Sequence, residues 1–326
     1  MQPTIPRRGS MQYWPRVRAQ RSYPSLSAPR SLKQLPAGLY GFAGYKVGMT
    51  HVMAIDTNKH SQTKGEEVSI PVTVLECPPL RVIGVRTYVQ RAYGIHPAKD
   101  VVVVNDKHIT RILSNKKTPP SDFSSISLSG IATVSVLVAT QPHLSGVHKK
   151  TPEVFEMLLG GTNEEKLNFA KEHAGRELLL QNTFKEGDLV DTHAVSKGKG
   201  LQGPVRRFGV SLRSHKSEKT KRGPGSLGPW SGQAHIMYRV AHAGQMGYHN
   251  RTEYNKQILK ISNNPEEVKL KGDFIQYGKV RSSFMLIKGS VTGSRKRLVL
   301  FTKPTRASRA VALPTIQTIS LESKQG

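Results

Sequence analysis

Positive charge is concentrated in three stretches of this chain, and that segregation limits which segments can share a core. The 326 residues carry 49 Lys and Arg against 22 Asp and Glu, a formal net charge of +27. Residues 1–36, 197–260 and 281–309 account for +26 of this charge, and the rest of the chain is nearly neutral. Packed like charges repel, so the three stretches are expected at the surface. A near-neutral body with basic segments is typical of a protein that lies against a polyanion.

Composition narrows the class of protein further. The hydrophobic fraction is 37% and the aromatic fraction 6%, which predicts a modest core and additional segments outside it. No apolar run exceeds four residues, whereas a membrane span needs about 20. The N-terminus lacks the apolar region of a secretory signal. These features predict a cytoplasmic protein with no membrane partner.

The chain has one cysteine, Cys77. A single cysteine cannot form an internal disulfide, and it cannot build a zinc site alone. We interpret Cys77 as a small buried residue in a strand rather than a redox group. This usage fits a reducing compartment.

Residues 1–36 predict a basic N-terminal extension that is disordered by itself. They contain six prolines and seven Arg or Lys, with no apolar periodicity. Prolines at positions 15, 24, 29 and 36 exclude a continuous helix.

Apolar and β-branched segments predict a mainly β body, with the first three strands antiparallel. Strands are expected at Gly41–Asp56, Val68–Cys77, Arg81–Val89, Gly187–Val195, Asp273–Val280, Ser283–Val291 and Arg297–Thr302. We expect residues 37–90, 185–196 and 261–310 to close one small β-barrel.

Residues 91–184 predict an α+β insertion in this body. Strands are expected at Val101–Val104, Ile131–Thr140 and Thr151–Gly161, a short helix at Asp106–Leu113, and a loop at Thr118–Ser125. The clearest helix is Asn163–Gly175, with Asn163 as the N-cap and a glycine at its end.

Residues 197–260 predict a long basic loop extension, and residues 311–326 a C-terminal tail. The loop stretch has ten glycines and almost no strand pattern before Ile258. A loop of this length inside a compact domain normally indicates that the secondary-structure prediction is wrong. Its charge suggests instead that the folding partner is another molecule.

The start of this loop, KGKGLQGPVRRFG (197–209), alternates cations with glycines. Glycine permits close backbone approach, so main-chain N–H groups can reach phosphates beside the lysines and arginines. The spacing is not that of a P-loop. The alternative is a flexible cationic loop. The turn SRKRLVLF (294–301) is interpreted as a second phosphate clamp.

Aromatic side chains later in the loop extension could stack on unpaired bases. They are Trp230, Tyr238, Tyr248 and Tyr254. Trp230 lies between Gly-Pro and Ser-Gly, with little apolar sequence around it. The alternative is a satellite hydrophobic cluster beneath the loop.

These arguments predict a set of RNA-binding residues in the basic stretches. The set is Arg7, Arg8, Arg16, Arg18, Arg21, Lys197, Lys199, Arg206, Arg207, Arg213, Lys216, Lys219, Lys221, Arg222, Trp230, Arg239, His242, Gln245, Tyr248, His249, Arg251, Lys256, Arg295, Lys296 and Arg297.

We find no pattern for a metal or for catalysis. His215, His235, His242 and His249 have no ligand spacing and no accompanying Cys or acid cluster. Hydrolase, metalloprotease and kinase motifs are absent from the sequence. The acids at positions 153, 156, 188 and 191 are interpreted as parts of solvated strand faces. We therefore predict no catalytic residue, no metal, no cofactor and no small-molecule substrate.

Several long segments resemble one known family. They are GFAGYKVGMTHV, VSKGKGLQGPVRRFGV, GSLGPW, AGQMGYHNRTEYNK, FIQYGKV and KGSVTGSRKRLV, in family order. The chain resembles the universal large-subunit ribosomal protein three family, in its archaeal and eukaryotic branch. The resemblance runs from the basic start to Phe301 and is weakest in residues 91–184 and after Thr302.

The resemblance implies a translation-protein-type β-barrel with an α+β insertion and long basic RNA-binding extensions. It also implies binding to large-subunit ribosomal RNA near its 3′ domain, a role in early subunit assembly, and extensions directed toward the peptidyl transferase centre. Trp230 matches the tryptophan at the tip of the family's loop. Where eukaryotic members have a histidine before that tryptophan, this chain has Glu218.

Residues and resemblance together predict a structural, RNA-organising protein of the large ribosomal subunit, located in the cytoplasm. Its expected partners are ribosomal RNA and neighbouring large-subunit proteins. One alternative is an RNA-modifying enzyme, which would need a cofactor pocket or an acid/base pair. Another is a DNA-compacting protein, although a Gly-rich aromatic loop suits irregular RNA better than a regular duplex.

Overall fold

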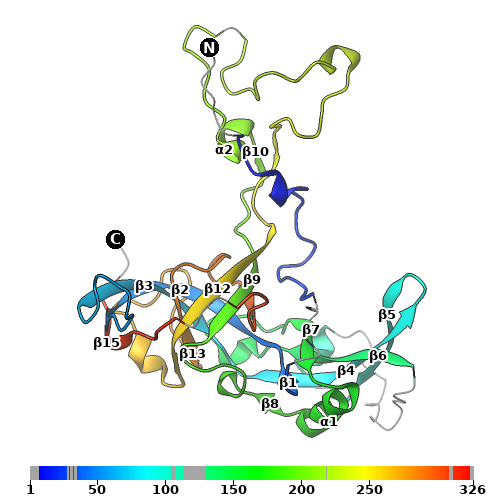
Figure 1. The fold of residues 1–326 in the computed structure, drawn as a ribbon, viewed down its shortest axis with the longest axis vertical. Coiled ribbons are helices and arrows are strands. Elements are labelled where there is room, and N and C mark those ends of the chain that lie inside the picture. Colours follow the sequence, from blue (N-terminus) through cyan, green and yellow to red (C-terminus); the bar gives the residue numbers. More distant parts are fainter. Residues whose placement is uncertain are drawn as a thin grey trace. The chain divides into compact units, whose positions relative to one another are not determined.

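The chain forms two compact units in the computed structural model (Figure 1). The structure describes residues 7–27, 29, 32, 35–103, 107–112, 130–217, 219–307 and 311–323. The unit that we call the extension unit comprises Met1–Arg21 and Val195–Asn250. The unit that we call the body comprises Ser22–Ala194 and Arg251–Gly326.

One sheet is built from seven strands in the order β14-β9-β12-β13-β3-β2-β15. Their bounds are β2 Gly41–Ile55, β3 Glu67–Glu76, β9 Leu189–Val195, β12 Asn250–Ser262, β13 Phe284–Lys288, β14 Leu298–Thr302 and β15 Thr315–Ile319. β14 pairs with both β9 and β2, so six of these strands form a closed cycle of pairings. β9 and β12 also lead along the chain into and out of the extension unit.

A second sheet in the body has the order β1-β7-β6-β4-β5, with β8 paired to β4. Its strands are β1 Gly38–Leu39, β4 Leu80–Arg91, β5 Gly94–Val102, β6 Ile131–Ala139, β7 Val154–Gly160 and β8 Glu177–Leu178. Helix α1 (Asn163–His173) contacts β6 and β4. Short 3-10 turns of the body lie at Ile109–Arg111, Pro142–Leu144, Leu180–Asn182 and Pro265–Val268.

Helix α1 is confirmed, but its cap differs from the prediction. Thr162 accepts a hydrogen bond from the Glu165 N–H, and the Glu165 carboxylate accepts one from the Thr162 N–H. This reciprocal capping box makes Thr162, not Asn163, the N-cap. The Asn163 amide instead donates to the Ile131 carbonyl at 3.0 Å.

Most predicted strands are confirmed within one to three residues at each end, because β-branched and apolar alternation marks half-buried strands reliably. The confirmed elements are β2, β3, β4, β6, β7, β9, β13 and β14. The strand expected at Val101–Val104 is the end of β5, which starts at Gly94. Of the helix expected at Asp106–Leu113, the described residues show one 3-10 turn. The loop at Thr118–Ser125 lies outside the described residues.

Three expectations about the body are wrong. Asp273–Val280 is a turn with one isolated bridge, from Phe274 to Gly278. Its apolar pattern comes from buried aromatic rings and not from a strand. β12 begins at Asn250, inside the stretch 197–260 that is expected to be a loop, because its first residues are polar and partly exposed. β15 lies in the segment expected to be only a tail.

The body also takes more of the chain than the boundaries expected from the sequence. β4 pairs with β5, β6 and β8, so it belongs to the second sheet and not to the sheet of β2 and β3. Residues from Ser22 onward belong to the body rather than to an arm. There the Tyr23 hydroxyl donates to the Val154 carbonyl at 2.8 Å, and Leu32 is buried.

Two buried carboxylates connect the two sheets. Glu76, at the end of β3, accepts backbone N–H groups of Gly146, Arg281 and Ser282 at 2.7–3.0 Å and the hydroxyl of Tyr277. Because several donors surround it, its charge is buried at a cost that hydrogen bonds offset.

Glu153 makes the second connection. Its Oε2 accepts the Tyr45 hydroxyl of β2 at 2.6 Å and the Thr140 hydroxyl at 3.1 Å. Asp191 is buried as well and accepts the N–H groups of Asn255 and Thr305. The interpretation of Glu153 and Asp191 as solvated acids is therefore wrong, since strand spacing alone does not distinguish an inward carboxylate from an outward one.

We expect Tyr277→Phe to lower the free energy of unfolding by about 1–3 kcal/mol at pH 7, because Glu76 loses a donor in a buried site. Burial and then the charge of Glu76 raise the pKa of Tyr277. A raised folded-state pKa gives stability that is complete below the unfolded value of about 10 and is lost at higher pH. The variant should therefore lose less stability between pH 9 and 11 than the parent protein does.

Chemical denaturation at several pH values measures both effects. Tyr254→Phe, at an exposed tyrosine, is the matched control and should change neither. If Tyr277→Phe and the parent protein lost the same free energy of unfolding between pH 9 and 11, the expectation would be wrong.

Candidate nucleic-acid interface

The extension unit has its own local structure, which begins with a pair of two-residue strands. β10 (Leu201–Gln202) pairs antiparallel with β11 (Gly244–Gln245). Next to β10 lies helix α2 (Pro204–Phe208), and 3-10 turns lie at Met11–Tyr13 and Ser231–Gln233. α2 begins at a proline and ends at Gly209 with φ +68°, the residue types preferred at those two ends.

The pairing of the two segments that contain β10 and β11 extends beyond these short strands. The Ser196 N–H donates to the His249 carbonyl and the Lys199 N–H to the Met246 carbonyl, both at 2.9 Å. Gly247 has φ +71°, and a Cβ there would lie 2.1 Å from the Lys197 carbonyl oxygen. Glycine is thus required at 247 for the two segments to approach.

The N-terminal arm, residues 7–21, packs against this paired segment. The Ala19 N–H donates to the Tyr248 carbonyl at 2.8 Å. His249 Nδ1 lies 2.7 Å from the Val17 carbonyl oxygen, and because a carbonyl only accepts, the proton is on Nδ1. The arm therefore has a partner within its own chain, contrary to the expectation from residues 1–36 alone.

A small aromatic cluster fixes the arm. The Trp14 and Phe208 rings stack with centroids 5.8 Å apart, and Tyr238 approaches Trp14 edge-on at 6.2 Å. The Arg16 guanidinium lies 4.6 Å from the Phe208 ring centroid. Stacking and cation–π contacts of this kind each contribute about 0.5–1.5 kcal/mol. The satellite cluster that was the alternative to base stacking exists, but around Trp14 instead of Trp230.

Several residues of the predicted RNA-binding set make internal contacts in the extension unit, and four of them are largely taken up by such contacts. Arg207 donates to the carbonyls of Gln245 and His242, both at 3.0 Å, and the Gln245 amide donates to the Gly247 carbonyl at 2.9 Å. His249 is buried, and Arg16 lies over the aromatic cluster. These four side chains therefore contribute to the internal order of the unit.

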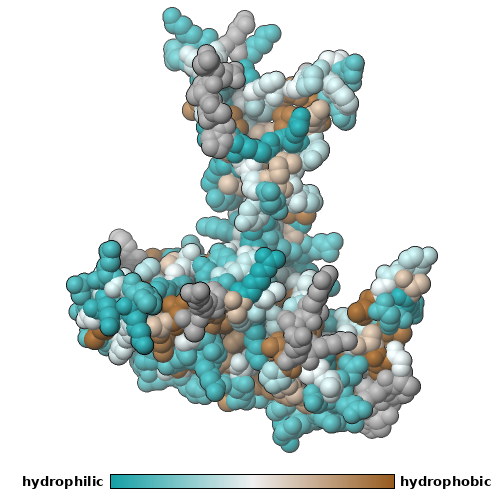
Figure 2. All heavy atoms as spheres, in the orientation of Figure 1, coloured by the Kyte–Doolittle hydropathy of each residue, from teal (hydrophilic) through white to brown (hydrophobic). Residues whose placement is uncertain are grey.

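The other predicted cations of the unit lie largely at its surface, which is mostly hydrophilic in Figure 2. The exposed members are Arg7, Arg8, Arg18, Arg21, Lys197, Lys199, Arg206, Arg213, Lys216, Lys219, Lys221, Arg222 and Arg239. Some of them also touch the unit itself. Arg7 donates to the Arg239 carbonyl at 2.7 Å, and Arg8 to the Ser211 hydroxyl at 3.3 Å. Arg206 donates to the Gln202 side chain at 3.4 Å, and the Arg18 guanidinium lies 5.5 Å from the Tyr248 ring centroid. His242 and Tyr248 are half-buried.

Trp230 is 53% exposed, as expected for an indole with no local apolar company. Its ring lies 5.6 Å from the His235 ring and is tilted by 47° to it. Tyr238 is 74% exposed although one edge meets Trp14.

The remaining predicted residues lie in the body. Arg251 is half-buried, and Lys256 forms an ion pair with Glu253 at 3.3 Å. Arg295 and Lys296 are exposed on the turn before β14, and Arg297 is half-buried.

That basic turn is held against β2. The Lys296 N–H donates to the Lys46 carbonyl, and the Lys46 N–H donates to the Arg297 carbonyl. The Lys46 ammonium donates to the carbonyls of Val291 and Gly293, and burial lowers its pKa. Lys46 therefore shapes the turn, which leaves Arg295 and Lys296 as its outward charges.

Sequence reasoning missed Trp14 and Phe208 as members of this site. Proline at 204 and glycine at 209 bracket the helix that carries Phe208, and this signal could have revealed it. Arg281, Lys288 and Arg306 are also exposed cations of the third basic stretch and were not predicted.

Nothing in the described residues indicates a metal centre or a membrane span. No group of three or more His, Cys, Asp or Glu side chains there could hold a metal ion. No helix in that part of the chain is long and apolar enough to cross a membrane. Cys77 is buried one residue beyond β3, where burial raises the pKa of its thiol. Glu218 lies outside the described residues.

Fold and charge define a basic, mainly β protein of the kind that binds nucleic acid. The family model of ribosomal protein L3 matches residues 2–326. The chain therefore belongs to the ribosomal protein L3 family and is a ribosomal protein.

Three relatives named large ribosomal subunit protein uL3 are similar over nearly their whole length. The protein of Methanothermobacter thermautotrophicus is 45% identical over 336 residues, covering 98% of each chain. That of Archaeoglobus fulgidus is 42% identical over 328 residues, again covering 98% of each. That of Methanocorpusculum labreanum is 40% identical over 335 residues and covers both chains completely.

We expect Phe208→Ala to release the arm from the extension unit. Truncating a packed phenylalanine costs about 3 kcal/mol or more, which raises the open population on the order of 100-fold. Limited trypsin digestion of the free protein should then cleave after Arg16 and Arg18 much faster. Leu212→Ala, at an exposed position of the same unit, is the control and should leave cleavage unchanged. Equal cleavage in both variants would show that the cluster does not hold the arm.

Proposed function

We propose that this chain is a structural component of the large ribosomal subunit, and that it binds ribosomal RNA through its extension unit. One observation carries the proposal: within this unit's two segments, 15 Lys and Arg face a single acid, Glu218. Among the described residues of the unit no carboxylate can neutralise these cations. A unit of this charge is stabilised by a polyanion, and releasing counterions from phosphates supplies the free energy.

Local geometry supports RNA as the polyanion. Exposed Lys197, Lys199 and Arg206 follow one another along a glycine-rich segment whose backbone can approach phosphates. Trp230 and Tyr238 present aromatic faces at the surface of the same unit, and stacking on unpaired bases suits loops and single strands. The basic turn with Arg295 and Lys296 is proposed as a further phosphate contact of the body.

We also infer the finer features that the family implies. The closed cycle of six strands is proposed to be the translation-protein-type barrel, with the second sheet and α1 as its α+β insertion. The proposed binding region is near the 3′ domain of large-subunit ribosomal RNA, with a role in early assembly. The extension unit would point toward the peptidyl transferase centre, with Trp230 near its tip.

We expect the double substitution Lys197→Gln and Lys199→Gln to make RNA binding less dependent on salt. Each lost phosphate contact lowers the slope of log K against log salt by roughly 0.7–0.9, so the pair should lower it by about 1.4–1.8. Binding of the full chain to large-subunit ribosomal RNA at 50–300 mM salt measures the slope.

The matched control is Lys59→Gln with Lys64→Gln, two exposed lysines in the loop between β2 and β3. That pair should leave the slope nearly unchanged, since it lies in the near-neutral part of the chain. Equal slopes for both pairs would argue against the extension unit as the RNA-binding surface.

We expect Trp230→Ala to leave the melting temperature of the free protein and its incorporation into large subunits nearly unchanged. The indole is half exposed, and its stacking on a base is worth only about 1–3 kcal/mol against many phosphate contacts. The effect should instead appear in the peptide-bond and tRNA-binding rates of subunits that carry the variant. A large drop in melting temperature would place Trp230 in a core, and unaltered rates would exclude a role at the centre.

A further inference from the structure

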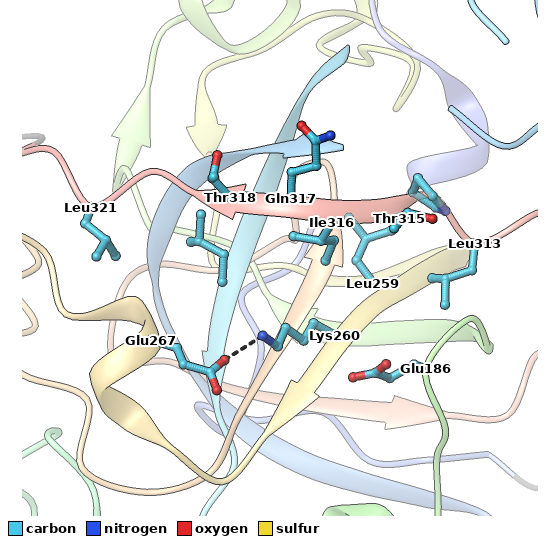
Figure 3. Close-up of a pocket in the computed structure, with 12 residues that line it drawn as sticks. Glu186, Leu259, Lys260, Glu267, Leu313, Thr315, Ile316, Gln317, Thr318 and Leu321 are labelled. Carbon is cyan, nitrogen blue, oxygen red and sulfur yellow. Dashed lines mark ion pairs between the residues drawn. The ribbon is translucent and has the colours of Figure 1, made fainter. Parts of the chain in front are cut away.

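One edge of the seven-stranded sheet is unused in the described structure. β15 pairs only with β2 and ends the strand order. Its other edge borders a groove of about 650 Å³, within the range of binding sites for ligands (Figure 3). The groove is lined on its opposite side by Leu259 and Lys260 of β12, by Glu186 and by Glu267.

The segment that carries β15 is fastened at both ends. The Gln257 amide donates to the Val311 and Ala312 carbonyls at 3.3 and 3.1 Å. At the other end the Lys271 N–H donates to the Leu321 carbonyl at 3.0 Å. Between these anchors the backbone pairing of Thr315–Ile319 within the described residues runs to β2 alone. The free edge is therefore already extended and held in place.

Apolar side chains line the groove beside this edge. Leu313 and Leu321 are each 37% exposed. Ile316 and Leu259 point toward each other across the groove, whereas Gln317 and Thr318 point away from it (Figure 3). Exposed leucines next to an unpaired strand edge are typical of a surface that another chain covers.

The charges in the groove disfavour RNA as the occupant. Lys260, the lysine that lines it, already pairs with Glu267 at 2.7 Å. Glu186 is exposed, and among the described residues no cation lies within ion-pair distance of it. One of its oxygens accepts the Ile261 N–H, which fixes the carboxylate at the groove's end. The surplus charge is thus negative, in a protein whose net charge is +27.

We propose that β15 is a docking edge for an extended basic segment of a neighbouring protein in the ribosomal particle. The segment adds a strand to β15, places an apolar side chain over Leu313 and Ile316, and directs a Lys or Arg toward Glu186. Strand addition gives affinity through main-chain hydrogen bonds and specificity through alternate side chains. The inference rests on the proposed function only for the identity of the particle.

Two substitutions test the docking, and neither lies at a residue that the register pairs with β2. The register with β2 shifts between Ile316 and Thr318, so Gln317 has no partner residue there. Gln317→Pro removes an N–H and blocks strand addition, and Gln317→Ala is its matched control. Glu186→Gln keeps the oxygen that accepts the Ile261 N–H but removes the charge.

The experiment replaces Leu313 with the photo-crosslinking residue p-benzoyl-phenylalanine and isolates large subunits that contain the full chain. We expect a crosslink to a peptide of another protein in subunits with Gln317 or Gln317→Ala. Gln317→Pro should reduce its yield about tenfold or more, the equivalent of 1.4 kcal/mol, and Glu186→Gln should reduce it by a smaller factor. Amide exchange of residues 315–319 should be slower in subunits than in the free protein, and Gln317→Pro should abolish the difference.

Crosslinks to RNA alone, or equal exchange in free protein and subunits, would overturn the docking inference. A crosslink yield unaffected by both Gln317→Pro and Glu186→Gln would overturn it too. Subunits that lack the chain altogether would instead refute the proposed function, and the inference with it.

Discussion

The buried Glu76 carboxylate is the constraint on which the architecture of the body depends. It ends β3 of one sheet and accepts donors from Gly146, beyond β6 of the other, and from Tyr277 and residues 281–282 before β13. Breaking such a site by removing donors leaves an uncompensated charge, which costs more than the site's net contribution. Glu153 repeats the arrangement with Tyr45, so the relative position of the two sheets is fixed by directed hydrogen bonds in addition to apolar packing.

The extension unit is stabilised differently. It has few apolar side chains and many like charges, yet Trp14, Phe208 and Arg16 form a small cluster. Two hydrogen bonds support it: a backbone one to the Tyr248 carbonyl and one from the His249 ring to the Val17 carbonyl. Some basic residues stabilise the unit itself, and Arg207 does so most clearly, through hydrogen bonds to two carbonyls. The exposed basic residues are available to a ligand. Burial, and not residue type, therefore separates the internal from the available cations.

Opposite charges are thus separated within one molecule. The extension unit has a single acid in its two segments, whereas in the described part of the chain Glu186, in the groove beside β15, has no ion-pair partner. Under both proposals, RNA and a basic protein segment would bind to different surfaces, because each surface repels the other's ligand.

The sequence by itself determined the mainly β class, most strand positions, helix α1, the charge segregation and the exposure of Trp230, because alternation, capping residues and charge are local properties. Only the tertiary structure decided that β4 joins the second sheet, that the aromatic residues of 273–280 form a turn, and that Glu153 and Asp191 are buried. The pairing partner of a strand depends on contacts distant in sequence, which the local spacing of residues cannot predict. For the same reason the sequence did not reveal the internal contacts of Arg207 and His249, and a two-residue strand such as β10 has no period to detect.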